Sequence, residues 1–275
     1  NPKHPRHDST RKPGSGHRTF LLVLVAVVAV LNWWLWQMAS SRENSPQTEF
    51  TSPVAPYDAE PDETVYGRYG GSRSCRECHE KEYALWQASH HALAERSQNP
   101  AIDRRSFDPP QTFSHGKQSS EVRVRDGQFE LVTLGLEGRQ AFPLARVLGV
   151  DPLRQFIVAE PRGRYQVTEL ATDARTNDWF DVYVDEDRQP GEWGHWTGRG
   201  MTWNTMCAFC HNTRVRKNYD FSSDTFNTVF KEHGVGCESC HGPLADHNAW
   251  QQARGGKQKG DPTLRRLDKR LTLDY

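Results

Sequence analysis

The motif Cys-x-x-Cys-His occurs three times in this chain of 275 residues and uses all six of its cysteines. The copies, called motifs one, two and three, are Cys75–His79, Cys207–His211 and Cys237–His241. Because no cysteine is left over, the chain has neither a disulfide framework nor a lone cysteine nucleophile. The fold is therefore expected to form around whatever the three motifs bind.

Cys-x-x-Cys-His is the attachment signature of c-type haem. Two thiols at this spacing reach two vinyl groups on one porphyrin edge, and the adjacent histidine becomes the proximal ligand of the iron. Three covalent haem c groups are predicted, attached by Cys75, Cys78, Cys207, Cys210, Cys237 and Cys240, with His79, His211 and His241 as proximal ligands. Zinc and thioredoxin-like redox chemistry are the alternatives, but neither requires a histidine directly after each pair.

Distal ligands must come from the other histidines, because methionine offers few candidates. Beyond the N-terminal apolar segment only Met201 and Met206 occur, and Met206 is bonded directly to Cys207. Bis-histidine coordination is therefore expected, with a lower potential than Met ligation gives. The remaining histidines outside the N-terminal tail are His90, His91, His115, His195, His233 and His247.

These six histidines differ in their sequence context. His91 and His247 are the first candidates, because each follows a motif at short range. His195, in a Gly- and Trp-rich loop, and His115 come next, whereas His233 is interpreted as a surface residue. Five tryptophans are expected to pack against porphyrins, with an ordinary core role as the alternative; they are Trp86, Trp193, Trp196, Trp203 and Trp250.

Residues 20–39 form an apolar run of the length that spans a bilayer. Residues 1–19 are basic and residues 40–70 are Pro-rich and mostly acidic, so we expect a cytoplasmic tail, a transmembrane anchor and a linker. A cleaved signal peptide is the alternative, and both interpretations export the rest of the chain. The predicted location is the inner (cytoplasmic) membrane, with the haem domain on the periplasmic or extracytoplasmic side.

The remaining residues, 71–275, are expected to form one trihaem cytochrome c domain of α+β class with much irregular structure. Residues 81–97 have helical spacing, and residues 251–275, which are charged and Gly-interrupted, are expected to be poorly packed. A small antiparallel β region is predicted as an insert over about residues 115–186, because EVRVRDGQFELVTL alternates around Asp126-Gly127, a type I′ hairpin signal. The formal net charge of zero gives no support to nucleic-acid binding.

Three segments resemble a family of exported multihaem c-type cytochromes, whose bacterial members often carry tetratricopeptide repeats after the haem domain. They are SCRECHEKEYALWQASHHALA, HWTGRGMTWNTMCAFCHNTRVRKNYD and VGCESCHGPLADHNAW, within residues 71–250. The chain also resembles, more distantly, the tetrahaem electron carriers of nitrifying bacteria. The resemblance implies that haems pack in close pairs and that a histidine after one motif ligates another haem. It selects His91 rather than His90, and His247.

The function expected from these features is electron transfer through three closely spaced haems, between redox partner proteins on the membrane and outside it. Motifs two and three are expected to hold neighbouring haems, and His247 is expected to ligate the haem of motif one. An oxidase or a reductase of small nitrogen or sulfur species, with one open haem face, is the rival enzyme hypothesis. A haem-bearing subunit of a larger membrane or filamentous assembly is the third hypothesis. Relatives of this kind often continue into a further haem motif, so the count of three applies to residues 1–275.

Overall fold

The computed structural model describes residues 26–37, 60–184 and 186–264. The chain divides into two units, residues 1–59 and 60–275. In the first unit residues 26–37 are helical, while the basic tail, both ends of the predicted span and most of the linker lie outside the described residues. No helix in the described part of the chain combines the length and the apolar character that crossing a membrane requires.

The second unit begins about ten residues earlier than Gly71, the start expected from composition. Residues Asp62–Gly67 form helix α2, in which Val65 is buried. The hydroxyl of Tyr66 donates to the carbonyl of Arg214 at 2.9 Å, and the N–H of Ala245 donates to the carbonyl of Arg68 at 2.9 Å. These contacts make the end of the predicted linker part of the folded unit.

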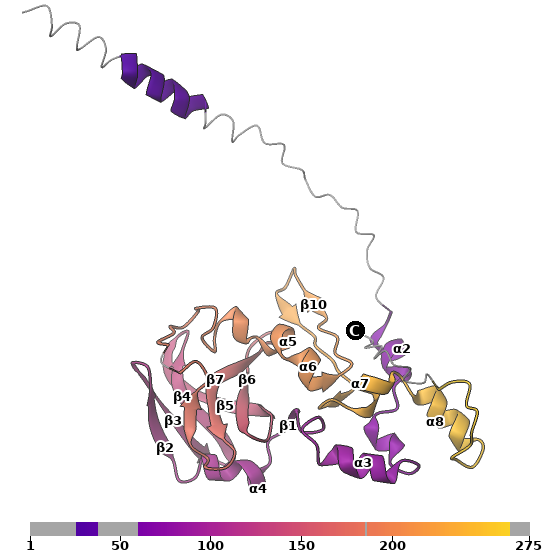
Figure 1. Cartoon of the computed structure of the whole chain (residues 1–275). Helices are drawn as coiled ribbons and strands as arrows, with labels where there is room; N and C mark the ends of the chain where they lie inside the picture. Colours follow the sequence, from indigo (N-terminus) through magenta and orange to yellow (C-terminus); the bar gives the residue numbers. More distant parts are fainter. Residues whose placement is uncertain (1–25, 38–59, 185, 265–275) are drawn as a thin grey trace, which may run out of the picture. The chain divides into compact units, whose positions relative to one another are not determined.

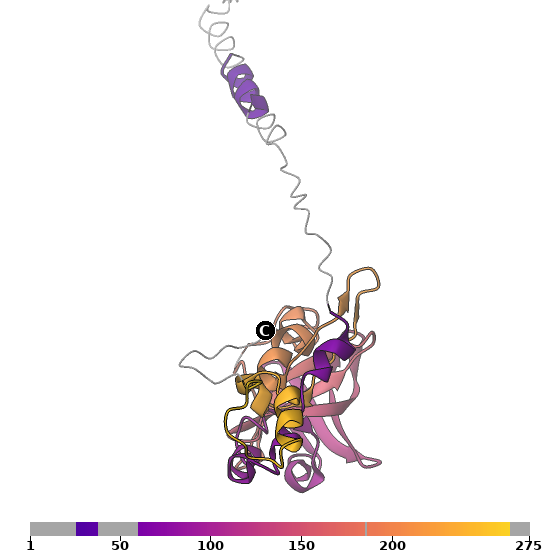
Figure 2. The same ribbon diagram turned by 90° about the vertical axis from the view of Figure 1, so that its right-hand side faces the viewer.

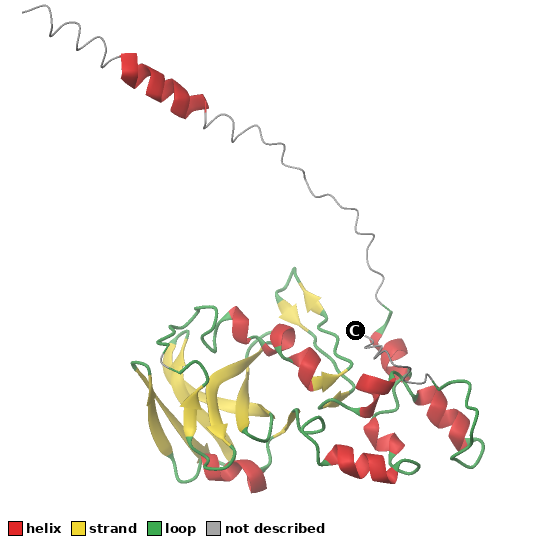
Figure 3. Ribbon diagram, in the orientation of Figure 1, coloured by secondary structure: helices red, strands yellow, loops and turns green. Residues whose placement is uncertain are grey.

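An antiparallel sheet of eight strands occupies one side of this unit (Figures 1 and 3). Its strands follow the order β2-β3-β4-β5-β6-β7-β8, and β1 pairs with β5. They are β1 (Glu95–Ser97), β2 (Gln111–His115), β3 (Gln118–Arg125), β4 (Gln128–Gly135), β5 (Gly138–Leu148), β6 (Leu153–Ala159), β7 (Tyr165–Asp173) and β8 (Trp179–Asp181). The predicted antiparallel β region is confirmed, and it starts slightly before residue 115.

The hairpin between β3 and β4 forms where the sequence predicts it. Asp126 and Gly127 both have positive φ, 51° and 80°, as a type I′ turn requires. Arg125 pairs with Gln128 across this turn, which fixes the register of both strands. The alternating apolar residues of β3 and β4 therefore share one face of the sheet.

The sheet curves until its two edges meet. The ring of Phe113 on β2 stacks on Trp179 on β8, with centroids 5.5 Å apart. The concave face holds a core of apolar side chains. Its members are Phe107, Val122, Phe129, Leu131, Phe142, Leu144, Val147, Phe156, Val158, Leu170 and Trp196.

A second core joins the convex face of the sheet to motif two. Ile157 and Val167 on the sheet pack with Trp203, Ala208 and Val215. This core attaches the short helices that carry motif two to the middle strands β5, β6 and β7, and Figure 1 shows α5 and α6 beside them.

The rest of the unit consists of short helices, two-residue strand pairs and loops (Figure 3). The helices, with η for 3₁₀, are η1 (Ser72–Cys75), α3 (Glu80–Gln87), α4 (Pro100–Asp103), η2 (Arg104–Ser106), η3 (Arg199–Met201), α5 (Trp203–Met206), α6 (Ala208–His211), α7 (Cys237–His241) and α8 (Ala245–Gln252). The strand pairs are β9 (Asn212–Thr213) with β12 (Glu232–His233) and β10 (Tyr219–Asp220) with β11 (Thr225–Phe226).

The helix expected over residues 81–97 is shorter in the structure. Helix α3 ends at Gln87, and residues 95–97 instead form β1, which pairs with β5. Pairing with a long neighbouring strand satisfies backbone groups of this segment that a longer helix would otherwise satisfy. Tertiary pairing thus outweighs the local helical spacing.

Candidate haem-binding site

Each of the three motifs forms a single helical turn. In motif one the N–H of His79 donates to the carbonyl of Cys75 at 2.9 Å, and in motif two His211 does the same to Cys207 at 3.2 Å. Motif three coincides with helix α7 and ends at Gly242, whose φ of 74° favours glycine. Residues three and four apart lie on one face of a helix, so both thiols and the histidine of a motif project together.

Motifs one and three lie against each other. The thiols of Cys75 and Cys237 lie close enough to interact. This interaction lowers the pKa of Cys237 to about 6 and, together with burial, raises that of Cys75 above its usual range. The indole N–H of Trp86, on α3, donates to the carbonyl of Val235 at 2.8 Å, just before motif three. Motif three therefore lies beside motif one, and its Ser239 also donates to the hydroxyl of Thr213, two residues after motif two, at 3.1 Å.

His247 lies opposite the proximal histidine of motif one. The ring centroids of His79 and His247 are 6.5 Å apart. Two imidazoles that share one metal ion, each at a metal–nitrogen distance of about 2.0 Å, have ring centres about 6.3 Å apart. The pair therefore has the separation that an iron held between the two rings requires.

The hydrogen bond of His247 also prepares it to bind a metal. Its Nδ1 lies 2.6 Å from Oδ2 of Asp261, a carboxylate that is almost fully buried. An Nδ1–H bonded to a carboxylate leaves Nε2 unprotonated and orients the ring, the usual arrangement for a metal-ligating histidine. Asp261 belongs to the C-terminal segment expected to be poorly packed, so at this point the structure differs from the expectation.

Motif two shows the same arrangement at its proximal histidine. The Nδ1 of His211 donates to the carbonyl of Ala94 at 2.8 Å, which leaves its Nε2 free. The thiol of Cys207 has a pKa raised to about 11 by burial and by the charge of Glu95. Phe209, inside the motif, and Met206 beside it are 40% and 52% exposed and offer apolar surface for a porphyrin.

His91 passes between motifs two and three. Its carbonyl accepts from the N–H of Val235 at 2.8 Å, two residues before Cys237. Ala94, three residues further on, is the partner of His211. The structure thus brings His91 to the motifs, and its side chain is exposed; its role as a distal ligand remains a prediction.

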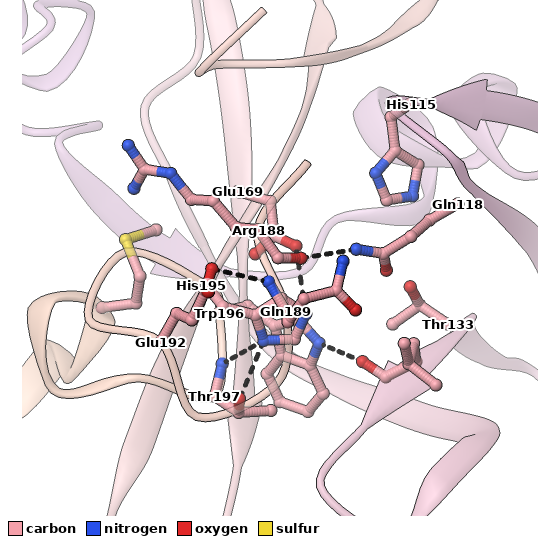
Figure 4. Close-up of polar contacts among 12 residues, drawn as sticks. His115, Gln118, Thr133, Glu169, Arg188, Gln189, Glu192, His195, Trp196 and Thr197 are labelled. Atoms are coloured by element: carbon pink, nitrogen blue, oxygen red, sulfur yellow. Dashed lines mark hydrogen bonds and ion pairs between the residues drawn. The ribbon is translucent and has the colours of Figure 1, made fainter. Parts of the chain in front are cut away.

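His195 and His115 lie inside the curved sheet instead of at a motif (Figure 4). The backbone N–H of Thr197 donates to Nδ1 of His195 at 3.2 Å, so the proton of the neutral ring is on Nε2. Nε2 faces Oε1 of Glu169 at 3.8 Å. This tautomer is the reverse of that at His211 and His247, and it does not suit an iron ligand.

His115 is likewise bound within the sheet. Its Nε2 lies 2.8 Å from the hydroxyl of Ser120, and its Nδ1 lies 3.8 Å from Asp181. Burial lowers the pKa of His115 and lowers that of His195 to about 4, so both rings are neutral at physiological pH. One ring nitrogen of each histidine is thus hydrogen-bonded to a neighbouring residue, whereas Nε2 of His195 has no hydrogen-bond partner among the described residues. The role of either histidine as a distal ligand remains a prediction.

His233, interpreted from sequence as a surface residue, is only partly exposed and contacts residues of motif two. Its Nδ1 lies 3.3 Å from Oδ1 of Asn212 and 3.5 Å from Oε1 of Glu95. Both atoms are acceptors, so Nδ1 carries the proton and Nε2 is free, as in His247. The position of His233 directly before Gly234 and motif three is the only sequence signal that points to it.

Glu95 is the buried centre of the contacts around motif two. Its carboxylate accepts from Arg146, Trp203 and Asn212, each at 2.6 Å. Burial opposes its ionisation, but the hydrogen bonds and the charge of Arg146 together lower its pKa. Sequence reasoning missed this residue, because its partners, which also include His233, come from four separate segments.

The tryptophans separate into two groups. Trp196 and Trp203 are 2% and 1% exposed and belong to the two protein cores, so for them the ordinary core role holds. Trp193 is 65% exposed, and Trp86 and Trp250 are partly exposed, with Trp86 next to motif three and Trp250 on α8. These three remain available for packing against a porphyrin.

The comparisons with known proteins point to the same residues. A family described as cytochrome c554 and c-prime matches residues 74–121 and 189–242. The first segment contains motif one, and the second contains motifs two and three. These segments are similar to that cytochrome family, and the resemblance expected from the sequence is confirmed there.

The match to the cytochrome family omits residues 122–188, which contain strands β4 to β8. Most of the sheet therefore lies between the two matched segments. No curated protein matches the chain.

Two solved structures are similar to parts of the chain. The undecaheme cytochrome from the S-layer of Carboxydothermus ferrireducens is 20% identical, with a TM-score of 0.41, over 67% of this chain and 22% of that one. The outer cell wall cytochrome OcwA is 19% identical, with a TM-score of 0.40, over 71% of this chain and 35% of that one. The present chain thus spans less than half of the length of either protein.

Proposed function

We propose that the protein is an electron carrier that holds three haem c groups, one on each motif, with histidines on both faces of the iron. The observation that carries this proposal is the facing pair His79 and His247, 6.5 Å apart, with His247 oriented by Asp261. Spare histidines with a free Nε2 argue for closed coordination, which suits electron transfer better than substrate binding.

The residues of the chain supply attachment, orientation and burial, and the haem groups, when bound, supply Fe(III)/Fe(II) cycling. The cysteine pairs hold the porphyrin edges, and His79, His211 and His241 are the proximal ligands. Asp261 and the carbonyl of Ala94 fix the ring orientation of His247 and His211. The buried carboxylate of Glu95, paired with Arg146, holds together the segments around motif two.

We further propose that the protein is anchored in the inner membrane with this domain on the outer side, where it exchanges electrons with redox partner proteins or within a larger membrane complex. The apolar run over residues 20–39 and the basic residues before it support this placement. Attachment of haem to Cys-x-x-Cys-His motifs in an exported chain agrees with it. Fractionation of cells that express a tagged full chain, before and after alkaline extraction, tests the anchor.

The test of the carrier function is a combined measurement on the purified full chain. Pyridine haemochrome analysis with intact mass is expected to give three covalent haems per chain, and redox titration is expected to reduce all of them reversibly. Absence of covalent haem, or haem that does not cycle, would contradict the proposal. Low-spin spectra that cyanide and nitrite leave unchanged are expected for a carrier.

One observation favours the rival enzyme function at motif two. His115 and His195 are bound inside the sheet, so fewer histidines remain to close the second face of that iron. If one of the three haems is high-spin and its spectrum shifts with nitrite or cyanide, the enzyme hypothesis replaces the pure carrier. Replacement of His233 by Ala identifies whether that residue closes the site.

A further inference from the structure

Motif three contains a buried carboxylate with an unusual set of partners. Glu238, between Cys237 and Ser239, is 3% exposed. Its Oε1 accepts from the backbone N–H groups of Gly70 and Leu244, each at 2.8 Å, and its Oε2 accepts from that of Gly71 at 2.6 Å. All three donors are uncharged peptide groups, so they hold the carboxylate without cancelling its charge.

Two of these donors come from the segment that leads into motif one. Gly70 and Gly71 directly precede η1, which ends at Cys75. Hydrogen bonds to an ionised acceptor are roughly twice as strong as neutral ones. Glu238 of motif three therefore accepts the backbone N–H groups of the residues that lead into motif one.

A second carboxylate fastens the same two segments. Glu232 accepts from the backbone N–H of Ser72 at 3.1 Å and from its hydroxyl at 2.8 Å. The hydroxyl of Ser72 in turn accepts from the N–H of Cys237 at 2.8 Å. Ser72 is completely buried, so this chain of hydrogen bonds is shielded from water.

A side chain of α8 also contacts the entry of motif one. A Cβ at Gly70 would lie 2.4 Å from Nδ2 of Asn248, which itself donates to the hydroxyl of Ser74 at 2.8 Å. Figures 1 and 2 both show α7 and α8 beside each other. The consequence is the contact already described, in which the thiols of Cys75 and Cys237 meet.

We propose that Glu238, with Glu232 and Ser72, forms a clamp that sets the spacing of motifs one and three and the electrostatic environment of the haem groups they hold. Glu238 is therefore a positioning residue, and it acts through Cys75 and Cys237. The inference rests on the proposed function, because it concerns haem groups attached at these cysteines. A buried negative charge one residue from an attachment cysteine also favours the ferric state and lowers the midpoint potential.

The test compares three variants of the full chain with its haems attached. Glu238→Gln removes the charge and places an amide N–H against backbone donors. Ser72→Ala removes the hydroxyl that joins Glu232 to the N–H of Cys237. Glu77→Gln is the matched control, because Glu77 also lies inside a motif but is exposed. The readouts are covalent haem per chain, the Soret circular dichroism that reports haem–haem coupling, and the midpoint potentials.

Glu238→Gln is expected to keep three covalent haems, to lose most of the coupled Soret signal and to raise one or two midpoint potentials. Ser72→Ala is expected to weaken the Soret signal with little shift in potential, and Glu77→Gln should match the unsubstituted chain. The inference is overturned if Glu238→Gln and Ser72→Ala both give the Soret signal and potentials of the control. If Glu238→Gln cannot be obtained with haem, the Soret signal of Ser72→Ala tests the inference: a weakened signal supports it, and the signal of the control overturns it.

Failure of the proposed function is recognised separately, in the unsubstituted chain. If that chain carries no covalent haem, or its haems do not undergo reversible reduction, both the proposed function and the clamp are refuted. If it carries redox-active haems that the variants leave unaffected, only the clamp is refuted.

Discussion

The sheet and the motif-bearing part of the domain are stabilised by different means. In the sheet, strands of up to eleven residues bury alternate side chains in one continuous apolar core. Around motifs one and three the helices are four to eight residues long, and the side chains they bury are polar ones such as Glu238 and Gln251. A region with so little apolar burial depends on point contacts and on covalently attached groups. The comparison indicates that the sheet can fold by itself, whereas the motif segments need their haems.

The largest expected effect comes from removing haem altogether. Haem-free chain, made without the attachment machinery, is expected to keep the sheet and to lose order over residues 60–94 and 232–264. Hydrogen exchange measures this directly: strands β3 to β7 should remain protected, while the amides of α3, α7 and α8 should exchange at nearly the unfolded rate. Simultaneous loss of protection in both regions would show that they fold as one unit.

The converse experiment destabilises the sheet from within. Phe156 is completely buried and packs edge-on to Phe107, with ring centroids 5.1 Å apart. Phe156→Ala is expected to lower the free energy of unfolding of the sheet by about 3–5 kcal/mol, because it leaves a cavity in the main core. Chemical denaturation followed by tryptophan fluorescence measures this. Leu136→Ala, at a position 70% exposed, should change the free energy little.

A pH-dependent effect on stability is expected in the sheet. Burial raises the pKa of Glu169 to about 7, so the protonated carboxyl group stabilises the folded sheet. This contribution is complete below the unfolded pKa of 4.5 and is lost as the pH rises through 7. Its full size is on the order of 3 kcal/mol.

Glu169→Gln tests this by removing the ionisation. Unfolding of this variant should show no decline in stability from about pH 5 to about pH 8, and at the higher pH it should be more stable than the unsubstituted chain. Glu137→Gln, in the exposed turn between β4 and β5, is the control and should keep the decline. An unaltered decline in Glu169→Gln would assign the pH dependence to another group.

The smallest expected effect concerns the orientation of one ligand. Asp261→Asn keeps a hydrogen bond to His247 but weakens it and no longer enforces the tautomer with Nε2 free. Loss of such an outer partner typically costs about 10- to 100-fold in metal affinity. We expect a minor high-spin fraction at one haem in absorption and electron paramagnetic resonance spectra, with haem attachment unchanged. His247→Ala should convert that haem fully to the high-spin state. A purely low-spin spectrum of His247→Ala would show that His247 is not a ligand.

Much of the sheet could be predicted from the sequence, because its signals are local. The alternation in β3 and β4 and the Asp126-Gly127 turn specify both the strands and their register. The β1 strand could not be predicted, since residues 95–97 carry helical spacing and acquire their structure only by pairing with β5. A bulge in β7, where residues 168–170 lie opposite Phe156 alone, also has no sequence signature.

The motif residues could also be predicted, because their sequence signal is local, but the arrangement of the three motifs relative to one another could not. Cysteine spacing identifies the attachment residues, but the contact between Cys75 and Cys237 depends on Glu232 and Glu238 receiving N–H groups from residues 160 positions away or more. His115 and His195 look like ligands in sequence because nothing local shows that a hydroxyl or an amide already bonds one ring nitrogen of each. His233 is the opposite case, since its partners Asn212 and Glu95 come from other segments.

The meeting of the two sheet edges also matters for how such a chain can change over evolution. Ser106, just before the first edge strand β2, accepts at its carbonyl from the indole N–H of Trp179 on the last strand, at 2.7 Å. The chain therefore enters and leaves the sheet at nearly the same point. The sheet is therefore a long insertion in the chain, and its first and last strands are in contact. Strands can be added to it or removed from its far side, while the spacing between motif one and the other two motifs stays unchanged.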